Sequence, residues 1–148
     1  MDRATFWQLI GTVDRAALRS GDEDGAVQPL IDALAAYGEK ELQAFEDLLT
    51  ERLYEIDSEA HADAAGASGK SGDGFLYARC YVVASGEAYY QRVLGDPAAM
   101  PRSIEEWCEP LLYVARRAWA ASTGKDEEDW EHEGPLSYET GSNAAKWS

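Results

Sequence analysis

A chain of 148 residues, 45% of them hydrophobic, is long enough for one domain with a single buried core. Its 28 acidic residues outnumber 13 basic ones, and the net charge of −15 argues against binding to nucleic acid or to an anionic membrane surface. No apolar run reaches the roughly 18 residues of a membrane span. The N-terminus also lacks a signal-peptide pattern, so we expect a cytoplasmic protein.

The first half of the chain is expected to be helical. Apolar residues at three- and four-residue steps predict a helix over residues 2–19, a loop over 20–25, and a helix that begins near Pro29 and ends before Gly38. The cleanest stripe belongs to the next helix and consists of Leu42, Phe45, Leu49, Leu53 and Ile56. The short turn between these last two helices favours antiparallel pairing.

The second half continues the helical pattern. Residues 66–74 are predicted to form a loop, and Asp73 is expected to cap a helix over residues 74–84. Further helices are predicted over residues 87–94, 97–100 and 110–122. No strand-like alternation persists anywhere. We therefore predict an all-α fold, a single compact domain of short helices over residues 1–124.

Residues 125–148 are predicted to form an acidic C-terminal tail. The run from Asp126 to Glu133 is rich in acids, and such runs are normally solvated. Aromatic residues interrupt this composition. We expect Trp130, Tyr138 or Trp147 to anchor the tail to the helical domain.

No cofactor or metal site is predicted. Gly69-Lys70-Ser71 looks like the end of a P-loop, but the required glycine five residues before Gly69 is absent and no strand precedes it. Asp57 and His61, four residues apart, are the strongest metal candidates. Because no further ligand series accompanies them, we favour a surface position without a ligand role.

The two cysteines, Cys80 and Cys108, lie far apart and form no CxxC motif. In a cytoplasmic protein we expect them to be reduced thiols packed as small apolar groups, with a disulfide as the alternative.

Arg79 is the polar residue of greatest interest, because tyrosines and a cysteine surround it in the sequence. Its stem is expected to be covered, so its guanidinium needs an acceptor. One interpretation is a buried ion pair with Asp73 or Glu87 that fixes the angle between two helices. The other is a guanidinium at the floor of a pocket, presented to an anionic ligand or a partner's carboxylate. We favour the ion pair.

Several of these residues resemble a known family. They are Phe6-Trp7, Phe45, the run Ser71-x-Asp73-Gly74-Phe75-x-Tyr77-x-Arg79, Gly86, Tyr89-Tyr90 and Asp96-Pro97. This pattern, over residues 2–120, is similar to the bacterial domain of unknown function 4240, typical of actinobacterial proteins. The chain departs from the family at Gly72, where a second acid is usual, at Ala78, where an aromatic residue is usual, and over residues 57–65. The resemblance implies a helical fold and a cytoplasmic setting, with no activity to inherit.

We therefore expect a non-enzymatic protein-interaction or regulatory module, for which an immunity-like role would suit the size and charge. A basic partner protein would meet its acidic helix faces or the tail around Trp130. The alternative is a small-ligand or enzymatic pocket around Arg79. The candidate residues for that pocket are Asp73, Tyr77, Arg79, Glu87, Trp7 and Trp107. No catalytic residue is predicted.

Overall fold

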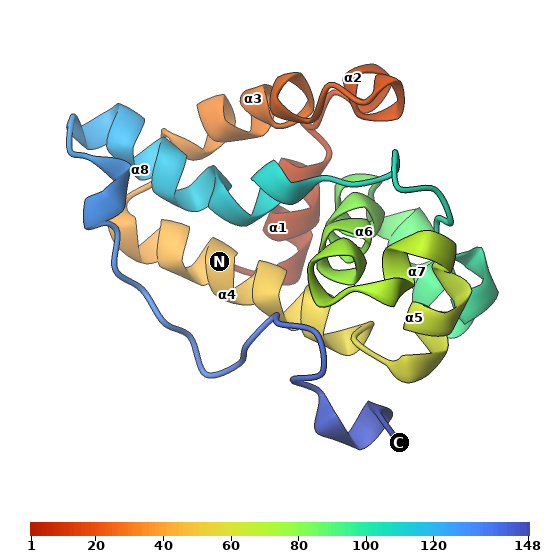
Figure 1. The fold of residues 1–148 in the computed structure, drawn as a ribbon. Coiled ribbons are helices and arrows are strands. Elements are labelled where there is room, and N and C mark those ends of the chain that lie inside the picture. Colours follow the sequence, from red (N-terminus) through yellow and green to blue (C-terminus); the bar gives the residue numbers. More distant parts are fainter.

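Eight α-helices and five 3-10 turns build the fold, and the computed structural model describes residues 1–148 (Figure 1). The helices are α1 (Arg3–Ile10), α2 (Arg15–Ser20), α3 (Glu23–Leu34), α4 (Glu39–Glu55), α5 (Glu59–Ala64), α6 (Gly72–Ala84), α7 (Glu87–Gly95) and α8 (Val114–Thr123). The 3-10 turns are Gly66–Lys70, Pro97–Ala99, Glu109–Tyr113, Glu127–Asp129 and Ala144–Lys146. The predicted all-α class is confirmed. None of the helices combines the length and the apolar character that crossing a membrane requires.

The longest helix, α4, has the apolar face that its sequence predicted. The buried residues of the predicted stripe are Leu42, Phe45, Leu49, Leu53 and Ile56. With them α4 packs against α1, α6 and α8, while α3 packs against α8 on the other side of the core. Each fully buried aliphatic side chain of this kind contributes about 1.5–3 kcal/mol, so this face anchors the fold.

Two helix boundaries near the N-terminus differ from the prediction. The single helix expected over residues 2–19 is wrong, because the carboxylate of Asp14 caps a new helix, α2, by accepting a main-chain N–H at 3.1 Å. Asp22 caps α3 in the same way at 3.0 Å, so this helix begins at Glu23 and Pro29 lies inside it. Capping by these aspartates therefore produces shorter helices in this region than the spacing of its apolar residues indicated.

The loop predicted over residues 66–74 is also wrong. Gly66–Lys70 forms a 3-10 turn, and α6 begins at Gly72. Its cap is Ser71, whose hydroxyl accepts the main-chain N–H of Gly74 at 3.0 Å. Asp73, predicted to be the cap, lies in the first turn of α6 and is exposed to solvent.

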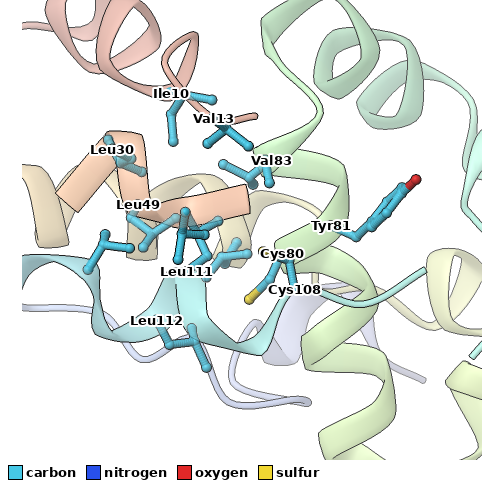
Figure 2. Close-up of a cluster of buried hydrophobic side chains, with 14 of the residues drawn as sticks. Ile10, Val13, Leu30, Leu49, Cys80, Tyr81, Val83, Cys108, Leu111 and Leu112 are labelled. Carbon is cyan, nitrogen blue, oxygen red and sulfur yellow. The ribbon is translucent and has the colours of Figure 1, made fainter. Parts of the chain in front are cut away.

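Both cysteines lie in the core. Cys80 on α6 and Cys108 before the Glu109–Tyr113 turn are fully buried free thiols among aliphatic side chains such as Val83 and Leu111 (Figure 2). The expectation of packed, reduced thiols is confirmed. Burial raises the pKa of Cys108 to about 12, and burial also raises the pKa of Cys80.

Neither cysteine is expected to react with a thiol reagent in the native protein at about pH 8, because the reactive species is the thiolate. Both are expected to be alkylated by iodoacetamide once the chain is unfolded in guanidinium chloride. Mass spectrometry before and after unfolding checks this. Alkylation of the folded protein within minutes would contradict the burial of these thiols.

The C-terminal region lies against the helical domain (Figure 1). Trp130 is buried, with its ring centroid 5.5 Å from that of Trp119 on α8. The rings of Trp147 and of Phe75 on α6 form a T-shaped pair, with 6.1 Å between their centroids. We call residues 135–148 the strap. It contains no α-helix and one 3-10 turn.

Candidate functional site

Arg79 is the largest fully buried side chain in the protein. One terminal nitrogen of its guanidinium, Nη1, donates to the carbonyl of Leu53 at 2.9 Å. The other, Nη2, donates to the carbonyl of Tyr138 at 3.0 Å and to the hydroxyl of Thr140 at 3.1 Å. The guanidinium carbon also lies 4.7 Å from the ring centroid of Phe75. Arg79 therefore joins the end of α4 to the strap.

The predicted ion pair of Arg79 with Asp73 or Glu87 is wrong. Both acids are exposed, and neither bonds to the guanidinium. Asp73 lies six residues before Arg79, which on a helix points it in a different direction. Burial lowers the pKa of Arg79, and the charge of Asp57 partly offsets that shift. The strap lies over the guanidinium, so Arg79 does not form the floor of an open pocket.

Asp57 is the second fully buried charge of the site. It lies between Ile56, the C-cap residue that follows α4, and Ser58, which caps α5. Its carboxylate accepts the main-chain N–H groups of Gly141 at 3.1 Å and Asn143 at 3.0 Å. It also accepts the indole N–H of Trp147 at 3.1 Å. All three donors belong to the strap, which satisfies the buried carboxylate.

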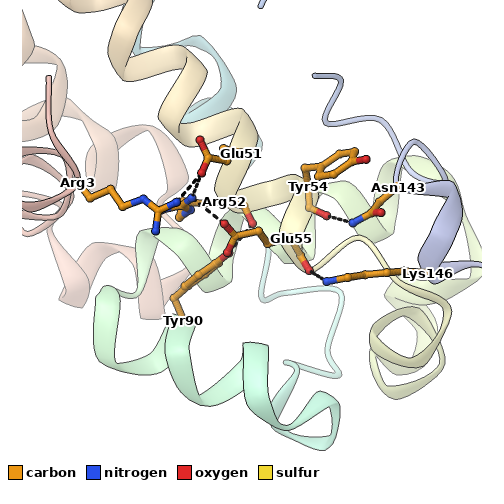
Figure 3. A network of polar contacts seen from close by, with 8 residues as sticks. All are labelled: Arg3, Glu51, Arg52, Tyr54, Glu55, Tyr90, Asn143 and Lys146. Atoms are coloured by element: carbon orange, nitrogen blue, oxygen red, sulfur yellow. Dashed lines mark hydrogen bonds and ion pairs between the residues drawn. The ribbon is translucent and has the colours of Figure 1, made fainter. Parts of the chain in front are cut away.

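The C-terminal end of α4 supplies main-chain carbonyls that accept hydrogen bonds from side chains around the site. The last four carbonyls of a helix have no partner within it and carry the negative end of its dipole. Here the carbonyls of residues 52–55 accept, in order, from the side chains of Tyr90, Arg79, Asn143 and Lys146. Figure 3 shows the first and the last two of these contacts. Two of the four donors are cations, as the dipole favours, and two belong to the strap.

A neighbouring network ties α4 to α7. Arg52 is nearly fully buried and donates to Glu55 at 2.7 Å and to Glu51, both on its own helix (Figure 3). Glu55 accepts the hydroxyl of Tyr90 at 3.0 Å. Burial, together with the charge of Glu55, raises the pKa of Tyr90. This network fixes the position of the helix end on which the strap lies.

The tryptophans that the sequence suggested for a pocket or a partner surface contact residues other than Arg79. Trp7 lies in the core, 5.3 Å from the ring of Tyr90. Trp107 packs edge-on against Tyr77 at 5.5 Å and donates to the hydroxyl of Ser68 at 2.9 Å. Trp130 donates its indole N–H to Glu46 at 3.3 Å, a separate contact from those at Arg79. Sequence reasoning missed the main chain of the strap and the contacts of Asp57 with it. It also missed the side chains of Thr140, Asn143 and Lys146.

His61 and Asp57, considered together as metal ligands, have different partners. The Nε2 atom of His61 lies 2.8 Å from the carbonyl of Val93, and its Nδ1 atom lies 2.5 Å from the hydroxyl of Ser58. The carbonyl can only accept, so Nε2 carries the proton and Nδ1 accepts from the serine hydroxyl. Desolvation lowers the pKa of His61, although the bond to Val93 opposes this shift. The folded protein therefore holds a neutral imidazole.

Stability is expected to fall as the pH drops below about 6.5, because the unfolded chain binds a proton at its ordinary histidine pKa while the lowered pKa of His61 keeps the folded imidazole neutral. The melting temperature of the His61→Gln variant is expected to depend less on pH in this range. The difference between the two proteins isolates His61 from carboxyls such as Glu46, whose pKa is raised by burial and whose effect has the opposite sign. Parallel pH profiles would contradict the assignment of a neutral His61.

A hollow of about 510 Å³ lies beside the start of the strap, between α4, α8 and residues 132–139. Four acids, Glu46, Asp47, Glu133 and Glu139, share its lining with Arg116 and His132. The Nε2 atom of His132 lies 2.8 Å from the carboxylate of Asp47. The hollow is therefore predominantly acidic.

The fold and these contacts define a small all-α protein that holds its own C-terminal segment against the end of its longest helix. The chain belongs to the family described as protein of unknown function (DUF4240), which matches residues 1–121. The resemblance expected from the sequence is confirmed. Asp57 and Arg79 lie within the matched region and the strap lies beyond it. No curated protein and no solved structure matches the chain at a significant level.

Proposed function

We propose that the protein is a non-enzymatic protein-interaction module that binds a peptide segment of a partner at the site its strap occupies. A regulatory or immunity-like role would suit such a module. The observation that carries this proposal concerns two fully buried charged side chains, Asp57 and Arg79. Both form hydrogen bonds with the strap instead of an ion pair with each other. A buried charge costs several kcal/mol unless hydrogen bonds compensate it. Here groups of a polypeptide segment supply that compensation, which supports a site for a bound peptide.

The kind of contact supports binding in preference to catalysis. The site engages main-chain groups of the strap, through the N–H groups of Gly141 and Asn143 and the carbonyl of Tyr138. Such groups are present in any polypeptide, so a partner segment can take the same position. The tethered strap competes with an effective concentration of about 1 mM, and a partner binds by displacing it.

The test uses the full chain with a protease site inserted into the exposed residues 133–136. The chain folds intact and is then cut, which removes the tether without removing the strap. A fluorescent peptide of residues 135–148 is expected to exchange into the site and give a saturable anisotropy change. The Asp57→Asn variant is expected to bind it at least about tenfold more weakly, as for a lost charge-assisted hydrogen bond. A folded, cut protein that never takes up the peptide would overturn the proposal.

A basic partner is favoured by the charge around the site. The protein carries a net charge of −15, and the acids of the hollow lie where a peptide would continue before residue 135. A Cβ built on Gly134 would overlap a carboxylate oxygen of Asp47 at 2.3 Å, so a partner residue other than glycine there would displace that side chain. Basic side chains there would lie among carboxylates.

A strap peptide extended at its N-terminus by four lysines is therefore expected to associate faster than the unextended peptide. The advantage is expected to be about tenfold at 0.01 M salt and to vanish near 1 M, because added salt screens the interaction. Stopped-flow anisotropy measures both rates, and a peptide extended by four serines is the matched control. Equal rates for the lysine and serine peptides at low salt would contradict electrostatic steering.

A further inference from the structure

We infer that the site selects its partner by sequence, and that the partner segment carries a hydroxyl residue followed by glycine, asparagine at the third position after it, and tryptophan at the seventh. The occupant is a segment of another protein with this chemistry. This inference rests on the proposed function, and it names what the bound segment must contain. It follows from Thr140, Gly141, Asn143 and Trp147, each of which contributes a different contact.

The site recognises Thr140 by hydrogen bonds to its hydroxyl group. The oxygen accepts from Nη2 of Arg79 at 3.1 Å and donates to the carbonyl of Gly72 at 2.7 Å. Among neutral side chains only a hydroxyl accepts and donates at one atom, since an amide separates the two roles and an aliphatic group has neither. Valine, which has the same shape, would leave both the guanidinium and the carbonyl without this partner. Serine would preserve both bonds.

The site requires glycine at position 141 because of the backbone conformation there. Its φ angle is +90°, a region that residues with a side chain rarely adopt. Nothing lies within 4 Å of the position a Cβ would take, so the constraint is conformational and not one of space. This turn brings the N–H groups of Gly141 and Asn143 to the two oxygens of the Asp57 carboxylate.

The site recognises Asn143 by its side-chain amide. It is 7% exposed, and its Nδ2 atom donates to the carbonyl of Tyr54 at 2.9 Å while its main-chain N–H bonds to Asp57. An aspartate has nearly the same shape but presents oxygen to that carbonyl. It would also bring a second negative charge toward Asp57, so the site excludes it.

The site recognises Trp147 by the N–H group of its indole and by its aromatic ring. The N–H donates to Asp57 at 3.1 Å, and the ring meets Phe75 edge-on. Phenylalanine would keep the apolar contact and leave one carboxylate oxygen with one donor fewer. Ala144 and Ala145 are exposed and have no polar side chain, so these two positions are free to vary.

A panel of peptides tests this selection on the cut full-length protein. Thr140→Val and Asn143→Asp peptides are expected to bind about 10- to 100-fold more weakly than the native sequence, as when a buried polar partner is left unpaired. The Thr140→Ser peptide is expected to stay within about threefold, and Ala144→Gln, the matched change at an exposed position, within about twofold.

The outcomes separate this inference from the proposal on which it rests. Native binding with equal affinity for the Thr140→Val peptide would overturn the selection and leave the module's function standing. Failure of the native peptide to bind would overturn the function itself. Light scattering on the uncut chain adds one more outcome, because a dimer that exchanges straps would make a second copy the partner and overturn the assignment to another protein.

Discussion

Arg79→Ala is expected to lower the free energy of unfolding by about 3–5 kcal/mol, the usual cost of removing one member of a buried charged set. The change removes three hydrogen bonds, to Leu53, Tyr138 and Thr140, and the contact with the ring of Phe75. It also leaves the buried carboxylate of Asp57 without the positive charge that faces it. Urea denaturation followed by circular dichroism measures the loss.

Two matched variants separate charge from volume. Arg79→Met keeps most of the apolar stem, and it is expected to lose nearly as much stability as Arg79→Ala because the hydrogen bonds and the charge are gone. Arg79→Lys keeps the charge and is expected to be intermediate, since a single ammonium cannot reproduce the fork of the guanidinium. A Met variant within about 1 kcal/mol of wild type would refute a polar role for Arg79.

A double-mutant cycle shows whether Asp57 and Arg79 depend on each other. Asp57→Asn in the Arg79→Met background is expected to cost less than in the wild-type chain, because the carboxylate has already lost the opposite charge. Additive losses would mean that the two charges contribute separately, each through its own contacts with the strap.

The burial of Arg79 was predictable, but its partners were not. Flanking tyrosines and a cysteine on a helix indicated a covered stem, and the side chain is fully buried. The acceptors are main-chain carbonyls of Leu53 and Tyr138, 26 and 59 residues away, and a carbonyl has no signature in the sequence. Reasoning from the nearest carboxylates therefore selected Asp73 and Glu87, which the helix geometry points elsewhere.

The same contrast holds for the rest of the fold. Apolar spacing predicted α4 well, because a long amphipathic helix buries a regular stripe. It failed over residues 2–19, where the caps at Asp14 and Asp22 determine the boundaries. Asp57 was considered only as a partner of His61, since a spacing of four suggests one helical face. It lies instead at a junction between two helices, where its carboxylate meets the strap.

Asp57→Asn is expected to release the strap while most of the helical domain stays folded. An asparagine presents an amide nitrogen where a carboxylate oxygen accepted, so at least one of the three strap donors faces another donor. A hydrogen bond to a charged group contributes about 1.5–3 kcal/mol, so hydrogen exchange at Gly141 and Asn143 is expected to accelerate about 100-fold. Hydrogen exchange followed by mass spectrometry locates the change.

The matched control is Asp63→Asn, which removes one exposed carboxylate from α5 and changes the net charge equally. It is expected to leave exchange in the strap as in wild type, so a difference between the two variants comes from the buried contacts and not from charge alone. In Asp57→Asn the fluorescence of Trp147 is also expected to shift toward that of a hydrated indole, because its N–H loses a charged acceptor. Unchanged protection of the strap in Asp57→Asn would mean that Arg79 and the carbonyls at the end of α4 hold the strap without the carboxylate.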